Sequence, residues 1–261
     1  MPIEPIGMLR RYVFEALQGQ PLIHGVFTRQ GGVSPAPWAS LNLGGGLGDE
    51  RANIVENRQR IFDAIGRRVE SIYDVWQVHG VEVICTDRAR PLEVEHVKAD
   101  AILTDRPEVT LFMRFADCAP IFFYDERRGV VGLAHAGWKG TVNRIAAVVV
   151  QRMQAHYGCR VEDIWAGIGP AIGPDHYAVG GEVIEQVERC FGERSAQFLV
   201  QRNGQVHFDL WQANRQVLLE AGVQRVQVAE VCTACSLTDW YSHRAEHGKT
   251  GRFGALIALN G

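Results

Sequence analysis

The chain has 261 residues, of which 46% are hydrophobic and 22% are charged, with a formal net charge of −3. These proportions are typical of a soluble globular protein. The slight negative charge argues against nucleic acid or an anionic membrane surface as the main partner. No apolar run reaches the roughly 20 residues that a membrane-spanning helix needs, so we expect no membrane contact.

The six cysteines are the next informative feature of the composition. The first residues contain no long apolar core followed by small residues, so we see no secretory signal. In a long chain without an export signal, cysteines more often stay reduced than form a disulfide framework. We therefore expect a cytoplasmic protein.

The first part of the chain predicts short strands separated by irregular, glycine-rich segments. A strand is expected at residues 23–28, followed by glycine-rich turns at 30–34 and 41–48. The second turn lacks the Lys-Ser/Thr pair of a phosphate-binding loop. The remaining expected elements are an amphipathic helix at 50–65, a strand, turn and strand over 75–85, a charged surface loop at 87–98, and strands at 100–104 and 109–114.

The centre of the chain predicts a hairpin that carries reactive side chains. Residues 122–124 and 130–134 have the pattern of buried strands separated by a polar turn. If they pair, Asp117 and Cys118, just before the first strand, meet His135, just after the second. Thr141 could cap a helix over residues 142–157, so a thiol, an imidazole and a helix N-terminus would converge.

The last hundred residues intermix strands and helices without an internal repeat. Strands are expected at residues 164–168, 206–210, 226–231 and 254–259, and helices at 183–190 and 210–221. This order, uninterrupted by a low-complexity linker, predicts a single α/β domain over residues 1–261 with a mixed sheet.

His79, Cys118 and His135 each occur where an expected strand meets a turn that contains glycine or proline. Strand ends hold side chains at fixed positions, which suits metal ligands. Two imidazoles and one thiolate suit zinc, with copper as a competitor. Three protein ligands leave a fourth position open, as in catalytic zinc sites, where bound water has a pKa of about 7. Ordinary core packing is the competing interpretation of a buried His or Cys.

The same atoms also fit a cysteine hydrolase. Cys118 would be the nucleophile and His135 its base, with Asp117 or Gln77 orienting the imidazole. His79 separates the two hypotheses, because a third soft ligand is needed for a metal and is superfluous for a thiol nucleophile.

Cys232 and Cys235 form a Cys-x-x-Cys pair. Such a pair could be redox-active or half of a zinc site. The chain has no second pair of this kind and no thioredoxin-like context, so we interpret the two residues as structural thiols.

Several motifs, taken in order, resemble one known family. The chain is similar to the YfiH-type or laccase-domain family of multifunctional purine nucleoside enzymes over nearly its whole length. His243 departs from the aromatic or arginine expected there. The matching motifs are Thr28-Arg29-Gln30-Gly31-Gly32, Leu41-Asn42-Leu43-Gly44, Gln77-Val78-His79-Gly80, Ala99-Asp100-Ala101, Ala116-Asp117-Cys118-Ala119-Pro120, His135-Ala136-Gly137-Trp138-Lys139-Gly140, Gly167-Ile168-Gly169-Pro170, Cys232-Thr233-Ala234-Cys235, Tyr241-Ser242-His243-Arg244 and Gly251-Arg252.

The resemblance implies an αββα-layered sandwich with mixed sheets, a fold shared with cysteine-hydrolase-like proteins. It implies a zinc ion held by His79, Cys118 and His135. It also implies phosphorolysis of adenosine, inosine and S-methyl-5′-thioadenosine, and hydrolytic deamination of adenosine. The partners would be purine nucleosides and inorganic phosphate.

On this hypothesis the remaining motif residues have defined roles. Asp117 would move the proton during deamination, beside the metal ligand Cys118. Arg29 and Lys139 would hold phosphate as cationic groups. Asn42 and Gln77 would form hydrogen bonds with the nucleoside.

Three alternatives stay open. The protein could be a Cys118-dependent hydrolase that edits peptidoglycan precursors, a copper-loaded polyphenol oxidase, or a zinc-stabilised interaction module. A multicopper laccase needs His-x-His pairs, and the nine histidines contain none. In each case we expect a cytoplasmic monomer that binds neither nucleic acid nor a membrane.

Overall fold

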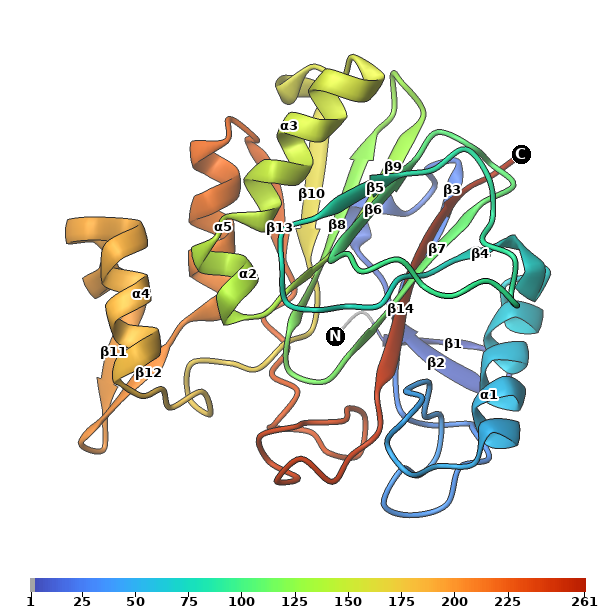
Figure 1. Cartoon of the computed structure of the whole chain (residues 1–261), viewed down its shortest axis with the longest axis horizontal. Helices are drawn as coiled ribbons and strands as arrows, with labels where there is room; N and C mark the ends of the chain where they lie inside the picture. Colours follow the sequence, from blue (N-terminus) through green and yellow to red (C-terminus); the bar gives the residue numbers. More distant parts are fainter. Residues whose placement is uncertain (1–2) are drawn as a thin grey trace.

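The computed structural model describes residues 3–261, which form two mixed sheets packed face to face with helices on both outer sides (Figure 1). This arrangement confirms the expected αββα sandwich. The first sheet has the order β1 (Ile3–Ile6), β2 (Leu9–Tyr12), β3 (Leu22–Phe27), β14 (Phe253–Leu259), β7 (Thr110–Phe115) and β4 (Ile72–Tyr73). The second has the order β13 (Arg225–Val228), β10 (Ile164–Ile168), β8 (Ala119–Asp125), β9 (Val130–Ala136), β6 (Ala101–Thr104) and β5 (Val83–Cys85).

The helices lie on the outer faces of the sandwich. Helix α1 (Arg51–Ala64) covers the first sheet through Ile61 and Phe62. The second sheet is covered by α2 (Trp138–Val142), α3 (Ile145–Tyr157) and α5 (Leu210–Glu220), and α4 (Gly181–Phe191) packs beside α2 at the edge of this layer (Figure 1). A separate hairpin pairs β11 (Leu199–Arg202) with β12 (Gln205–Phe208). Within residues 3–261, no helix is both long enough and apolar enough to span a bilayer.

Strand β8 shows how the sequence builds this four-layer core. Its side chains alternate, so Ile121 and Phe123 face the helices whereas Phe122 and Tyr124 face the first sheet. Both faces of the strand are therefore apolar, and all of its residues are buried. A continuous apolar run is the pattern expected for a strand covered on both sides.

The predicted central hairpin is confirmed. Strands β8 and β9 pair antiparallel, with Ala119 opposite Ala136 and Pro120 opposite His135. His135 lies within β9 rather than just after it. The pairing brings Cys118, just before β8, to the same end of the second sheet as His135.

Two local predictions near the site are wrong. The first strand of the expected strand, turn and strand over 75–85 does not form: Trp76 makes only an isolated bridge with Lys98. The turn that follows is held by the carboxylate of Asp100, which accepts the backbone N–H groups of residues 78–80. The expected helix over 142–157 is broken by Arg144, whose φ is +62°. Thr141 therefore lies inside the short α2, where its hydroxyl donates to Gly137 O, and it does not cap the long helix.

Candidate metal centre

The ligand atoms of His79, Cys118 and His135 meet at one end of the sandwich, where all lie within 4.8 Å of one another. Cys118 Sγ is 3.9 Å from His79 Nε2, and the two imidazole ring centroids are 4.8 Å apart. At tetrahedral angles and normal zinc bond lengths, sulfur and nitrogen ligands lie about 3.5 Å apart. The three donors therefore fit a zinc-type ion with only small adjustments.

Two of the three ligands occupy segments that pass from one sheet to the other, and the third lies on a strand. His79 lies between β4 of the first sheet and β5 of the second, and Cys118 lies between β7 and β8. His135, on β9, packs against Phe115 of the first sheet at a centroid distance of 5.5 Å. The centre is thus built where both sheets end, from a turn and two strand ends rather than from a single loop.

Asp100 supports two of the three ligands, a role that the sequence motif alone did not reveal. It is fully buried, and its Oδ1 lies 2.8 Å from His135 Nδ1. The same carboxylate accepts the backbone N–H groups of His79 and Gly80 at 2.9 and 2.7 Å. Because Nδ1 of His135 is held by Asp100, Nε2 is left for a metal, an arrangement typical of metal-bound histidines.

Cys118 and His135 also polarise each other electrostatically. Burial by itself would raise the pKa of Cys118, but His135 and His79 outweigh it and lower the pKa to about 6. Burial likewise opposes protonation of His135, but Cys118 and Asp100 raise its pKa to about 9. The pair therefore favours a thiolate, the form of cysteine that binds metal and acts as a nucleophile.

Gly137 leaves the space that the ligands occupy. A Cβ atom at this position would lie 2.9 Å from Cys118 Sγ and 3.1 Å from the His79 ring. The first distance is shorter than real Cβ contacts and the second is tight, so a larger residue before α2 would require the two ligand side chains to shift.

A cavity of about 570 Å³ opens onto the three ligands. Its volume is in the range of small-molecule sites. It is lined by Gly44, Gly45, Leu47, Trp76, Gln77, His79, Arg114, Ala116, Asp117, Cys118, His135, Trp138, Tyr177, His243, Arg244 and Arg252. The lining thus joins the metal ligands to aromatic and cationic side chains.

Asp117 lies in this lining beside Cys118, and both of its carboxylate oxygens accept hydrogen bonds. Oδ1 accepts the Thr233 hydroxyl at 2.7 Å, and Oδ2 accepts the backbone N–H of Arg244 at 2.7 Å. Asp117 therefore connects the ligand segment to two C-terminal loops and holds Arg244 at the cavity.

The structure does not bring Arg29 to the cavity. Its guanidinium forms an ion pair with Glu246 at 3.0 Å, donates to backbone carbonyls including that of Ala39, and stacks on Tyr241. These contacts hold the guanidinium outside the cavity lining, and the phosphate-binding role of Arg29 stays a prediction. Lys139 is exposed and absent from the lining; its Nζ lies 5.4 Å from the ring of Trp138, which does line the cavity.

Asn42 and Gln77 have structural hydrogen bonds. Asn42 is fully buried, and its side-chain oxygen accepts the backbone N–H groups of Gly44 and Arg252. Gln77 lines the cavity, but its amide pairs with both backbone groups of Arg114. Both residues position neighbours that line the cavity.

The cations that do line the cavity are Arg114, Arg244 and Arg252. Arg244 and Arg252 lie in motifs of the family resemblance, but no role was assigned to them from the sequence. Their residue type was the signal in the sequence that could have identified them. Arginine is a typical anion-binding group, and the two C-terminal motifs place two arginines close together in the chain.

Comparison with known proteins identifies the family. The sequence profile described as "Multi-copper polyphenol oxidoreductase laccase" matches residues 23–260. The chain belongs to this family. Purine nucleoside phosphorylase of Deinococcus radiodurans is 40% identical over 237 residues, covering 90% of this chain and 88% of that protein.

Further members confirm the expected YfiH-type relationship. Purine nucleoside phosphorylase YlmD of Geobacillus stearothermophilus is 38% identical over 244 residues, covering 90% of this chain and 89% of that protein. The crystal structure of YlmD from the same organism superposes with a TM-score of 0.92, covering 99% and 98% of the two chains. Another relative, 33% identical over 82% of this chain and 85% of its own length, is named adenosine deaminase RL5 and comes from an unknown prokaryotic organism.

Proposed function

We propose that this protein is a zinc-dependent enzyme that cleaves adenosine, inosine and S-methyl-5′-thioadenosine with phosphate and also deaminates adenosine. The observation that carries the proposal is a three-ligand centre with one side facing a cavity that is also lined by Arg244 and Arg252. The names of the relatives support the two reactions.

The donor set fits zinc better than copper in an oxidase. Two imidazoles and a thiolate suit zinc, and a zinc ion there would supply Lewis acidity toward a substrate oxygen or water. A multicopper oxidase needs several copper ions, whereas this centre offers only two histidines and one cysteine. Oxidation of phenols by copper-loaded protein is therefore the weaker alternative.

The side chains of the cavity provide the other functions. In phosphorolysis an oxygen of phosphate bonds to C1′ of the ribose as the bond from C1′ to the purine breaks. Arg244 and Arg252 would hold the phosphate oxygens through charge-assisted hydrogen bonds. Trp138 and Tyr177 would contact the purine, because flat aromatic rings suit its shape. Asp117, the carboxylate among the lining residues, would move the proton when water replaces the 6-amino group.

The first test is an assay of inosine and phosphate with zinc-loaded protein. We expect hypoxanthine and ribose 1-phosphate, and loss of both products in His79→Ala. A Cys118-dependent peptidoglycan hydrolase would instead survive this substitution, since its nucleophile and base remain. Activity of His79→Ala equal to that of the natural sequence would refute the metal-dependent reaction.

The second test concerns the arginines. Arg252→Ala should raise the KM for phosphate at least about tenfold and leave the KM for inosine nearly unchanged, because it removes a charge-assisted contact. Arg215, exposed on α5, provides the matched control, and Arg215→Ala should change neither constant. Equal changes in both constants in Arg252→Ala would exclude the assigned phosphate site.

All six cysteines are free thiols in the described residues. This supports our proposal that the protein works in a reducing compartment, the cytoplasm.

A further inference from the structure

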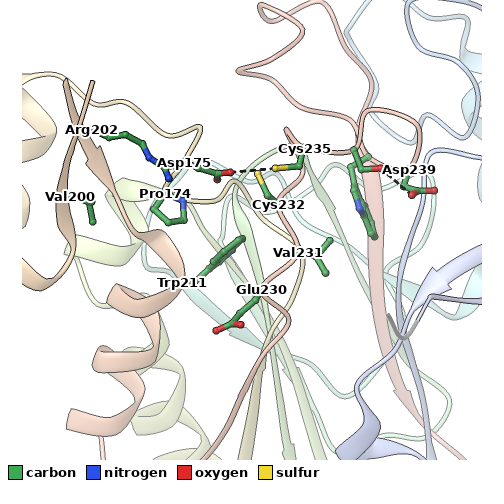
Figure 2. Close-up of a pocket in the computed structure, with 12 residues that line it drawn as sticks. Pro174, Asp175, Val200, Arg202, Trp211, Glu230, Val231, Cys232, Cys235 and Asp239 are labelled. Atoms are coloured by element: carbon green, nitrogen blue, oxygen red, sulfur yellow. Dashed lines mark hydrogen bonds between the residues drawn. The ribbon is translucent and has the colours of Figure 1, made fainter. Parts of the chain in front are cut away.

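We infer that the protein holds a second zinc ion, at Asp175, His176, Cys232 and Cys235. One ligand atom from each of these residues lies within 4.8 Å of all the others. Figure 2 shows Cys232 and Cys235 beside Asp175, at the edge of a cavity of about 640 Å³ that is separate from the cavity at the first centre. Asp175 and His176 are thus the two further ligands that the Cys-x-x-Cys pair lacked in the sequence.

The spacing of the donor atoms matches tetrahedral zinc. His176 Nδ1 lies 3.7 Å from Cys232 Sγ and 3.6 Å from Cys235 Sγ. Asp175 Oδ2 lies 3.5 Å from Cys235 Sγ and 3.2 Å from His176 Nδ1. From normal zinc bond lengths, ligands at tetrahedral angles lie about 3.4 to 3.6 Å apart. The side chains therefore stand close to the geometry of a bound ion.

The backbone around the four ligands is also arranged for a thiolate. The N–H of Gly173 donates to Cys232 Sγ at 3.2 Å, a contact that stabilises negative charge on sulfur. A Cβ at Gly173 would lie 2.8 Å from Asp175 Oδ1 and 3.2 Å from Cys232 Cβ. Glycine at this position thus allows the two ligand loops to approach each other.

The ligand number distinguishes this centre from the first one. Four protein ligands complete the coordination of zinc, which is the pattern of structural sites, whereas three leave a position for substrate. Three of the four ligand residues are exposed, so an ion can enter from solvent. The second centre is therefore structural, and its zinc does not take part in the reaction directly.

The proposed structural role follows from what the two loops hold. The loop after β10 and the loop after β13 are paired through Ala171 and Cys232. Between the two cysteines, Thr233 donates its hydroxyl to Asp117, and Ile172 N donates to Asp117 O at 2.9 Å. A zinc ion that joins these loops would fix Asp117, the neighbour of the ligand Cys118.

The test is the zinc content of protein purified with zinc under reducing conditions. We expect two zinc ions per chain in the natural sequence, one in His79→Ala, and none when Cys235→Ser is added to His79→Ala. Cys190 lies outside both clusters, so Cys190→Ser in the His79→Ala background should keep one ion. This readout is independent of the proposed reaction, which may fail while the stoichiometry holds.

Other outcomes would overturn the second centre. Zinc absent from His79→Ala, or retained when Cys235→Ser is added, would mean that these four residues bind no ion. His176→Ala provides a second variant should Cys235→Ser fail to fold. Cobalt loaded into His79→Ala should give the visible absorption of tetrahedral cobalt, and His176→Ala added to His79→Ala should abolish it; an unchanged spectrum would contradict the assignment.

Discussion

Asp100 links two ligands of the first centre: its carboxylate forms a hydrogen bond with Nδ1 of His135 at 2.8 Å and accepts one from the backbone N–H of His79 at 2.9 Å. One buried side chain thus sets the orientation of an imidazole on β9 and the turn that presents the other imidazole. Removal of a hydrogen-bond partner of a metal ligand typically lowers metal affinity about 10- to 100-fold.

Asp100→Asn should therefore weaken zinc binding by about 10- to 100-fold. An amide has one accepting oxygen, so it cannot accept hydrogen bonds from both His135 and all the backbone N–H groups of the turn. Competition with a chromogenic chelator measures this affinity. Asp125 is equally buried, at the far end of the β8–β9 hairpin, so Asp125→Asn controls for loss of a buried charge. Equal affinities of the two variants would remove Asp100 from its supporting role.

Gly137→Ala should disrupt the first centre sterically, since the new methyl group meets Cys118 Sγ at 2.9 Å. A displacement of about 1 Å can cost about 100-fold in rate, so we expect a loss of that order in turnover together with weaker zinc binding. Gly180→Ala is the control, because a Cβ there meets no atom within 4 Å. Turnover in Gly137→Ala within twofold of the control would show that the ligands can adjust.

The metal-free protein should show an unusually reactive thiol. The pKa of Cys118 is lowered to about 6, and alkylation needs the thiolate, which exists above the pKa. The rate of modification by iodoacetamide should thus rise with pH, with its midpoint at about pH 6. An ordinary thiol would give a midpoint at about pH 8.5. His135→Ala removes the group that lowers this pKa, so its midpoint should move to higher pH.

Mass spectrometry of the peptide that contains Cys118 gives the site-specific rate. Cys190 is the internal reference, since burial raises the pKa of its thiol. Zinc should protect Cys118 from the reagent and leave Cys190 unchanged. A midpoint for Cys118 at or above that of Cys190 would contradict the thiolate–imidazolium pair.

Arg29→Ala should affect stability more than phosphate binding. The substitution leaves Glu246 half-buried without its ion-pair partner, which costs about 3 kcal/mol of unfolding free energy. Urea denaturation measures this loss. Arg10, which pairs with Asp239 at the surface, is the control, and Arg10→Ala should cost less than about 1 kcal/mol. A selective increase in the KM for phosphate in folded Arg29→Ala would restore its binding role.

Much of the fold could be predicted because its core strands are continuous apolar runs. The β8–β9 hairpin and the positions of α1, α4 and α5 follow from hydrophobic patterning. Strands β1 and β2 were not predicted, since Leu9–Tyr12 mixes arginines with apolar residues at the edge of a sheet. The strand expected before the turn at residues 78–80 does not form, and the sequence could not show that Asp100, 20 to 22 positions away, holds this turn.

Some residues of the site could likewise be predicted from the sequence, and others could not. His79, Cys118 and His135 could be proposed as a set because they combine soft ligand types with strand ends, and the structure brings them together. The contacts of Arg29 could not be predicted from the sequence, because its ion-pair partner Glu246 lies 217 positions further along the chain. Asp175 and His176 were not considered for the same reason: Cys232 is 56 positions from His176, and only the fold shows that they are neighbours.

The three ligands of the first centre come from segments that meet only in the folded sandwich, and the surface loop around residue 93 lies between His79 and the other two. A single cut in the surface segment near residue 93 would separate His79 from Cys118 and His135. Neither fragment alone should hold zinc at the first centre, although the C-terminal fragment still carries all four ligands of the second. The two fragments mixed together should recover the first ion by reassembling the sandwich. Zinc at the first centre is therefore a measure of whether the segments on either side of this loop are correctly assembled.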